Sequence, residues 1–156
     1  MSMTNEEKFK ILADQIKIAE HLDSEILTQS ELTRVDVKTV DRSWVFQITF
    51  PYFLAIEDYL LFTSAITEEF KTIAEVTCNI TIKDRANQDE YAIKYFSYCI
   101  DQTKLSPKVK GQLKQKRLIM SGDILKVMCQ NDVERDHFDK ACNGSLIAAY
   151  QQCGFN

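Results

Sequence analysis

The sequence predicts an α+β fold in which helices pack against a small mixed or antiparallel sheet. Two hydrophobic patterns alternate along the chain: apolar residues recur every three or four positions in some segments and every second position in others. The chain has 156 residues, of which 45% are hydrophobic and 27% charged, which is typical of a globular domain and not of a disordered segment. We therefore expect a single domain over residues 4–156, with residues 1–3 as a cloning remnant that ends at a natural Met3 start.

The first half of the chain predicts the order helix, strand pair, helix, strand. Thr4 and Glu7 form a capping box in front of the first helix, and residues 40–42 have the composition of a hairpin loop. Pro51 is expected to end the second strand. The predicted elements are a helix over 4–18, a helical turn over 23–28, strands over 32–39 and 43–50, a helix over 55–74 and a strand over 75–84.

The second half of the chain predicts further helices around one strand. Asn87 and Glu90 are expected to cap the first of these helices, and Ser106 followed by Pro107 to begin the next. A turn at 121–122 then leads into a strand whose two faces are both apolar, so we expect both to be covered. The predicted elements are a helix over 87–100, a helix over 106–116, a strand over 123–130 and a last helix capped by Asp132 and stopped by Gly154.

A partial internal repeat is one interpretation of this order. The series helix, strand pair, helix, strand over 8–84 is echoed by helix, strand, helix over 106–154, where the closing strand is missing. The alternative, which we favour, is that similar series of helices and strands recur by chance in any α+β chain. The missing strand also predicts that the sequence stops inside a longer chain.

Positive charge is concentrated in one segment of an otherwise acidic protein. The chain has 19 Lys and Arg against 23 Asp and Glu, a net charge of −4. Residues 104–117 contain six basic residues and no acidic one, which leaves 13 basic against 23 acidic residues elsewhere. This asymmetry predicts a localised contact surface and argues against a chain that binds nucleic acid over its whole surface.

The candidate contact residues lie on the helix predicted over 106–116 and just beyond it. They are Lys108, Lys110, Lys114, Lys116 and Arg117. One interpretation is a solvated helix face whose lysines favour the negative end of the helix dipole. The other is a binding surface for DNA, RNA or an acidic protein segment. Lys110 and Lys114 are one turn apart, where like charges repel, and this mild cost favours a contact role.

A second candidate is a stripe of tyrosines. Tyr91, Tyr95 and Tyr98 recur at helical spacing on the helix predicted over 87–100. We expect them to pack at the edge of the core with their hydroxyl groups reaching water, because tyrosine has an apolar ring and a polar tip. The alternative is an aromatic contact stripe for a partner.

The residues give little support for catalysis. His21 and His137 are far apart in sequence, and His137 and Cys142 are five residues apart, which does not place them on one helix face. The five cysteines form no CxxC pair, so they are expected to be small core residues in a reducing cytoplasm. No phosphate-binding or metalloprotease motif occurs, and we expect no catalytic residue, metal or cofactor in this segment. The apolar runs are too short for a membrane span.

Long runs of the sequence resemble one family. The segments LSPKVKGQLKQKRLIMSGDILKV and NDVERDHFDKACNGSLI, with FKILADQIKI, EDYLLF and NQDEYAIKYF, resemble the N-terminal domain of the PolC-type DNA polymerase III alpha subunit of low-GC Gram-positive bacteria, in its staphylococcal form. The resemblance implies a parent enzyme that synthesises DNA and proofreads it with a 3′–5′ exonuclease. It also implies that the catalytic domains lie beyond residue 156, so no catalytic or metal-binding residue is carried over to this segment.

The resemblance also implies a fold and a role. The family's N-terminal domain is thought similar to the polymerase-binding domain of the tau clamp-loader subunit, with a fold like a type II KH domain. The GxxG loop with which KH domains clamp a nucleic-acid backbone does not occur here. We therefore expect a noncatalytic domain that tethers the polymerase to a replisome protein, such as the tau subunit or another replication factor. The alternatives are weak, sequence-independent DNA binding by residues 107–117 and an autonomous enzyme.

Overall fold

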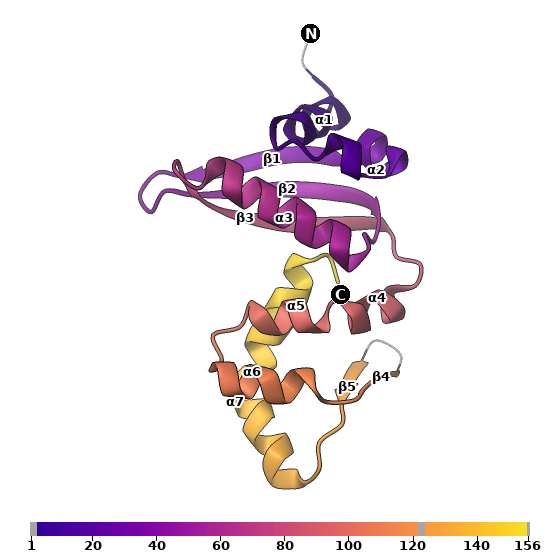
Figure 1. Cartoon of the computed structure of the whole chain (residues 1–156), viewed down its shortest axis with the longest axis vertical. Helices are drawn as coiled ribbons and strands as arrows, with labels where there is room; N and C mark the ends of the chain where they lie inside the picture. The colour runs from indigo at the N-terminus through magenta and orange to yellow at the C-terminus, as the bar shows by residue number, and fades with distance from the viewer. Residues whose placement is uncertain (1–2, 122–123, 156) are drawn as a thin grey trace. The chain divides into compact units, whose positions relative to one another are not determined.

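The computed structural model describes residues 3–121 and 124–155, with the side chains of 141–143 outside the description (Figure 1). Contacts within the chain group into two compact units, Met1–Ala86 (unit 1) and Asn87–Asn156 (unit 2). The single domain expected over 4–156 stays a prediction. Of the proposed cloning remnant, residues 1–2 lie outside the described residues.

Unit 1 is a mixed sheet covered by helices. Its elements are α1 (Asn5–Gln15), the short 3-10 helix η1 (Ala19–His21), α2 (Ser24–Gln29), β1 (Glu31–Lys38), β2 (Ser43–Tyr52), α3 (Ile56–Phe70) and β3 (Glu75–Asp84). The strand order is β1-β2-β3, where β1 is antiparallel to β2 and β2 is parallel to β3. The predicted α+β class with a small mixed sheet is confirmed.

Local chemistry explains the boundaries of these elements. The Thr4 hydroxyl accepts a hydrogen bond from the Glu7 amide at 3.1 Å, so the predicted N-cap is confirmed. The helix ends at Gln15, earlier than predicted, and Lys17 then adopts a positive φ of 63°. In the loop after β1, Asp41 accepts hydrogen bonds from both the amide and the hydroxyl of Ser43, as expected for a tight hairpin turn.

The prediction that Pro51 ends the second strand is wrong. β2 continues to Tyr52, which pairs with Asp84 of β3. The pairing of β2 with β1 stops at Thr49, so β2 has no β1 neighbour at Pro51 whose ladder its missing N–H would break. Proline is tolerated where one side of a strand is unpaired.

An aromatic core lies between the sheet and the helices. Phe9 of α1, Phe50 of β2 and Phe62 of α3 are all at most 1% exposed, and their ring centroids lie 5.6–6.0 Å apart. The alternation in β2 directs its aromatic residues to the face that the helices cover. Of the predicted face of α3, Tyr59, Phe62, Ile66 and Phe70 are buried. Ile73 lies beyond the end of α3 and is 55% exposed, so its assignment to that face is wrong.

Unit 2 is mainly helical. Its elements are α4 (Gln88–Lys94), α5 (Phe96–Asp101), α6 (Pro107–Lys114), β4 (Leu118–Ser121), β5 (Ile124–Val127) and α7 (Asp132–Gln152). A buried cluster of Phe96, Ile100, Leu113 and Phe138 joins α5, α6 and α7. The Tyr150 hydroxyl donates a 2.7 Å hydrogen bond to the Ala92 carbonyl and so ties α7 to α4.

Two predicted caps in unit 2 are corrected. Asn87 does occupy the N-cap position of α4, but it has a φ of 62° and its side chain makes no capping hydrogen bond. The cap of α7 is Asn131 and not Asp132, since the Asn131 carboxamide accepts from the Glu134 amide at 2.9 Å. The predicted stop is confirmed: Gly154 has a φ of 96°, and its amide donates to the Gln151 carbonyl.

A hairpin replaces the single strand that the sequence predicted over 123–130. β4 was missed, and β5 pairs with it in antiparallel register, with Leu118 opposite Val127 and Met120 opposite Leu125. The predicted turn at 121–122 falls partly outside the described residues. The expectation that both strand faces are covered is wrong, because Ile124 is 62% exposed. The inward face packs on the core cluster of unit 2, whereas the other face is open.

Candidate functional site

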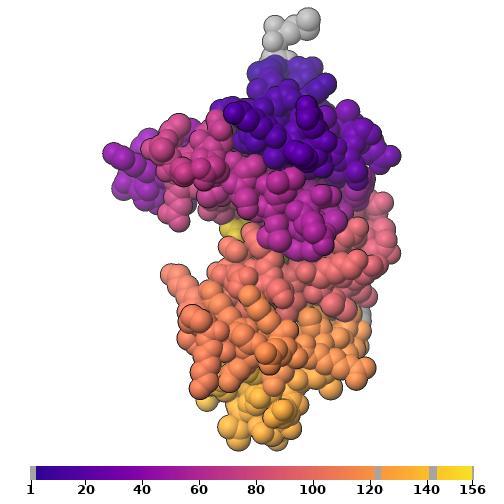
Figure 2. Space-filling model, in the orientation of Figure 1, coloured from indigo at the N-terminus to yellow at the C-terminus, as the bar shows by residue number. Residues whose placement is uncertain are grey.

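Helix α6 is positioned by a cap at one end and a buried leucine near the other. The Ser106 hydroxyl accepts from the Val109 amide at 3.3 Å, and Pro107 occupies the first helical position, as predicted. Leu113 is 1% exposed and fixes which face of α6 turns inward. Figure 2 shows this segment and the hairpin after it, in orange, at the surface of unit 2.

Two of the candidate lysines hold α6 against α5. Lys114 forms an ion pair of 2.6 Å with the Asp101 carboxylate, and the Lys110 ammonium donates to the Asp101 backbone carbonyl at 3.1 Å. Asp101 is the last residue of α5, where the negative end of the helix dipole also favours a cation. The repulsion expected between Lys110 and Lys114 is therefore offset by a shared acidic partner.

A third candidate lysine holds the C-terminal end of α6 against α7. The Lys116 ammonium lies 2.7 Å from a carboxylate oxygen of Glu134, and this lysine side chain is only 15% exposed. The same carboxylate accepts a 3.0 Å hydrogen bond from the Gln130 amide. The hydrogen bond from Lys116, followed by that from Gln130, lowers the pKa of Glu134 below its ordinary value. Glu134 thus fixes both ends of the hairpin that lies between α6 and α7.

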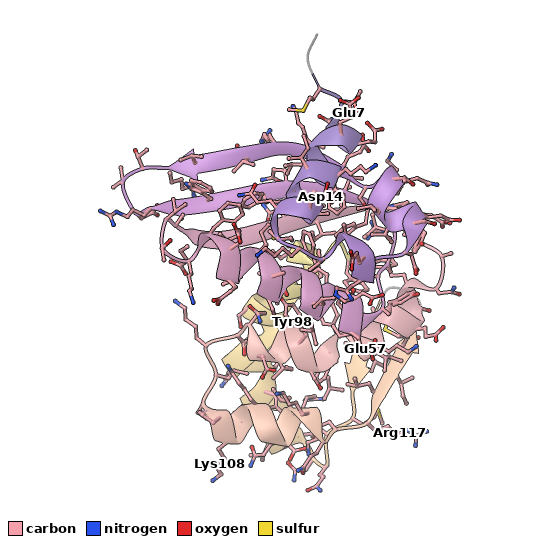
Figure 3. All side chains as sticks on the ribbon, turned by 45° about the horizontal axis from the view of Figure 1, so that its top comes forward. Glu7, Asp14, Glu57, Tyr98, Lys108 and Arg117 are labelled. Carbon is pink, nitrogen blue, oxygen red and sulfur yellow. The ribbon has the colours of Figure 1, made fainter. Side chains whose placement is uncertain are left out.

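The remaining candidate cations are exposed. Within the part of the chain that the structure describes, Lys108 and Arg117 form no ion pair, and neither does Lys104. Figure 3 shows the Lys108 and Arg117 side chains extending away from the ribbon near opposite ends of the α6 segment. The five predicted contact residues therefore divide into three that join elements of unit 2 and two that face solvent.

The tyrosines do not form one exposed stripe. Tyr95 lies at the break between α4 and α5, is 2% exposed and packs edge-on against Phe155 with 5.3 Å between ring centroids. Burial raises the pKa of its hydroxyl group. Tyr91 and Tyr98 are half-buried. The placement favours the expectation that these rings pack at the edge of the core, and it removes Tyr95 from any surface that a partner could contact.

The open face of the hairpin is a feature that the sequence analysis missed. Apolar and cationic side chains alternate along this face, which carries Arg117, Ile119 and Ser121 on one side of the hairpin and Ile124, Lys126 and Met128 on the other. Ile119 is 37% exposed, Ile124 62% and Met128 47%. The signal that could have revealed it is the alternation through Leu118 and Met120, which turns Ile119 to the other side, but the strand is only four residues long.

Groups that could carry chemistry are dispersed. His21 and His137 are exposed and lie in different units, and the Cys142 side chain lies outside the described residues. The Cys99 and Cys153 thiols are buried, and the hydrogen bond between them, together with burial, raises the pKa of Cys99. In the described ranges 3–121 and 124–155, no group of three or more His, Cys, Asp or Glu side chains could hold a metal ion. Nor does any helix of these ranges have the length and apolar character to cross a membrane.

These features define an α+β module with a mixed-sheet unit and a helical unit that presents cations. The family model described as "DNA polymerase III polC-type N-terminus I" matches residues 8–80, and the model "DNA polymerase III polC-type N-terminus II" matches residues 94–156. The chain belongs to this family of polC-type N-terminal regions, so the resemblance seen in the sequence is confirmed. The two matched segments correspond to unit 1 and unit 2.

Proteins named "DNA polymerase III PolC-type" are similar over the whole chain. The protein of Staphylococcus saprophyticus is 87% identical over 156 residues, and those of Staphylococcus haemolyticus and Staphylococcus aureus strain Newman are each 67% identical over 156 residues. The chain spans only 11% of the length of these relatives. No solved structure matches.

Proposed function

We propose that this chain is a noncatalytic interaction module of a PolC-type replicative DNA polymerase, which tethers the polymerase to another replisome protein such as the tau clamp-loader subunit. The parent enzyme would synthesise DNA and proofread it in domains outside this segment. The observation that carries the proposal is the division of the cations: Lys110, Lys114 and Lys116 are used within unit 2, whereas Lys108 and Arg117 remain exposed in an acidic chain. Exposed cations without a structural role are available to an acidic partner.

The topology of unit 1 supports a likeness to type II KH domains and to the polymerase-binding domain of the tau subunit. With the short helices η1 and α2 added after α1, its order of helix, strand, strand, helix, strand and its combination of antiparallel and parallel pairing fit that expectation. Because the sequence has no GxxG loop for a nucleic-acid backbone, we propose protein binding as the main role of the module.

Charge reversal at the exposed cations tests this function. The variant Lys108→Glu/Arg117→Glu is expected to weaken binding of the chain to the purified tau subunit, measured by surface plasmon resonance, mainly through a slower association rate. The matched control is Lys10→Glu/Lys140→Glu, which makes the same change in net charge at two other exposed lysines. Equal affinity of both variants and the unmodified chain for tau, and for other replication factors captured with the chain as bait, would refute the proposed contact.

Weak DNA binding is a second candidate, and the same exposed cations favour it. With Lys104, Lys108 and Arg117 as phosphate contacts, the logarithm of affinity should fall with the logarithm of salt concentration with a slope of about −2 to −3. Fluorescence anisotropy with single- and double-stranded DNA at low salt measures this slope. Absence of binding at low salt would remove the candidate, and the net charge of −4 predicts that any binding is weak.

A further inference from the structure

We propose that the open face of the β4–β5 hairpin binds an extended segment of a partner protein in which carboxylate and apolar side chains alternate at every second position. This inference rests on the proposed function, since it assumes that the chain is an interaction module. It adds the surface, the backbone conformation and the chemistry of the partner. The surface is distinct from Lys108 and is formed by Arg117, Ile119, Ile124, Lys126 and Met128.

The register of the hairpin puts these five side chains on one face. Ile119 lies directly opposite Lys126, and the Met128 amide donates to the Arg117 carbonyl at 2.9 Å, which places Met128 opposite Arg117. Residues that face each other across an antiparallel pair point to the same side of it. The alternate residues of both strands point inward to the core cluster of unit 2, so this outer face is left to solvent.

The face combines exposed apolar side chains with cationic side chains that form no ion pair within the described part of the chain. Ile119, Ile124 and Met128 are each more than a third exposed. Arg117 and Lys126 are exposed and, within the described part of the chain, form no ion pair. Each cation lies opposite an apolar side chain: Arg117 opposite Met128, and Lys126 opposite Ile119. A partner that covers this pattern must supply both negative charge and apolar surface.

The spacing of the pattern selects an extended partner. Neighbouring side chains on one face of a strand lie about 6.5–7 Å apart, because each residue advances the chain by about 3.3 Å. An extended segment with the same period can place a carboxylate beside each cation and an apolar side chain beside each apolar residue. In the described residues each strand of the hairpin has a single strand neighbour, so its outer edge can also pair with the backbone of an added strand. Helical spacing would not match this repeat over more than one pair.

A direct binding experiment on the whole chain tests the inference. The probe is the synthetic peptide Asp-Ser-Leu-Ser-Asp-Ser-Leu, whose residues on one side alternate between Asp and Leu. The first control peptide has Lys in place of Asp, and the second has Ser in place of Leu. Titration of the nitrogen-15-labelled chain is followed by amide chemical shifts, which detect weak binding. We expect the Asp–Leu peptide alone to shift the amides of 117–121 and 124–128, with an affinity that falls as ionic strength rises.

Two single substitutions separate charge from apolar contact. Lys126→Glu should weaken binding about tenfold, because a like charge then opposes the peptide carboxylates. Ile124→Ser should weaken it less and without a change in salt dependence. Both side chains are exposed, so the fold should be retained, and a well-dispersed amide spectrum verifies this. The matched controls are Lys140→Glu and Val133→Ser, which change an exposed lysine and a 79% exposed valine elsewhere in unit 2.

The outcomes distinguish this inference from the proposed function. Equal binding of the Asp–Leu and Lys–Leu peptides, or no shift in the hairpin at saturating peptide, overturns the hairpin surface even if the tau subunit binds the chain. Loss of peptide binding in Lys126→Glu but not in Lys140→Glu supports it. If the peptide binds as expected and no replication factor binds the chain, the proposed tether fails while the assignment of the surface stands.

Discussion

The two units of this chain use ion pairs between elements to different extents. In unit 1, the exposed pairs Arg34–Asp36 and Lys71–Glu68 join neighbours in sequence and Lys83–Glu31 joins β3 to β1, while an aromatic core holds the helices on the sheet. In unit 2, Lys114–Asp101 and Lys116–Glu134 join different helices around a smaller core cluster. The hairpin and the helices α4, α5 and α6 are short, so we expect each of them to bury little apolar surface and polar contacts between elements to contribute more there.

This difference changes how a cluster of lysines should be interpreted. A basic segment in an acidic chain suggests a binding surface. Its basic residues nevertheless differ in how exposed they are and in whether they contact an acidic residue of the same chain. Lys116 is an internal contact, with a side chain 15% exposed, whereas Lys108 is exposed. The functional hypothesis therefore applies to the cations that the fold leaves unpaired and not to the segment as a whole.

The largest expected effect comes from the aromatic core of unit 1. Phe62→Ala removes a ring that is 0% exposed and that contacts the rings of Phe9 and Phe50. We expect the free energy of unfolding of unit 1 to fall by about 3–5 kcal/mol, the usual cost of such a cavity. Trp44 is the only tryptophan and lies in β2, so its fluorescence during urea denaturation reports on unit 1.

The same experiment tests the prediction of a single domain over 4–156. Circular dichroism at far-ultraviolet wavelengths follows both units, and in particular the helices of unit 2. If Phe62→Ala shifts only the Trp44 transition, the units unfold separately. Coincident transitions by both signals, shifted equally, would support one cooperative domain.

A core truncation in unit 2 is the reciprocal test. Leu113→Ala opens the cluster at α6, where the leucine is 1% exposed, and should cost about 2–5 kcal/mol in the unfolding of unit 2. Circular dichroism should show an earlier helical transition, while the Trp44 transition stays unchanged if the units are independent. A cost well below this range would mean that ion pairs, and not the apolar cluster, dominate the stability of unit 2.

The sequence predicted unit 1 better than unit 2 for a physical reason. The strand Glu75–Asp84 was predicted with its observed bounds because ten residues of alternation give a strong period-two signal. β4 has only four residues, and residues 115–117, which lie between α6 and β4, contain no Gly or Pro that would signal a turn. Pro51 was misjudged because its tolerance depends on where β1 stops pairing, which is a tertiary fact.

The candidate site was only partly predictable. Sequence located the basic residues and the cap at Ser106, because both are local properties. It could not assign Lys116 to Glu134, which lies 18 residues away and meets it only after the hairpin folds. It also gave the tyrosines a shared face, whereas the helix break at Tyr95 buries that ring.

A smaller effect is expected in the dependence of stability on pH in the acidic range, where the Glu134 carboxylate becomes protonated. The pKa of Glu134 is lowered in the folded chain, so its contribution is fully present above the ordinary value of 4.5 and is lost as pH falls through the lowered pKa. Glu134→Gln should therefore lower the melting temperature of unit 2 at neutral pH, by less than Leu113→Ala does. The difference from the unmodified chain should vanish at strongly acidic pH.

The matched control lies in unit 1. Hydrogen bonds from Gln47 and then Arg34 lower the pKa of Asp36, so Asp36→Asn should reduce stability with the same dependence on pH. If the units unfold separately, this loss appears in Trp44 fluorescence and the Glu134→Gln loss does not. A Glu134→Gln difference that persists unchanged at acid pH would contradict the role of the carboxylate as the charged partner of Lys116.

The smallest effect tests whether the α5–α6 ion pair is structural. The side chains of Lys114 and Asp101 are 35% and 52% exposed, and exposed pairs contribute about 0.2–1 kcal/mol. A double-mutant cycle of Lys114→Met and Asp101→Asn should give a coupling energy in this range that shrinks as salt is added. A coupling energy of zero would mean that Lys114 is not committed to α5. Lys114 would then be as available to a partner as Lys108. It would have to be counted with Lys108 and Arg117 as a residue of the proposed contact, and not with Lys110 and Lys116 as a structural residue.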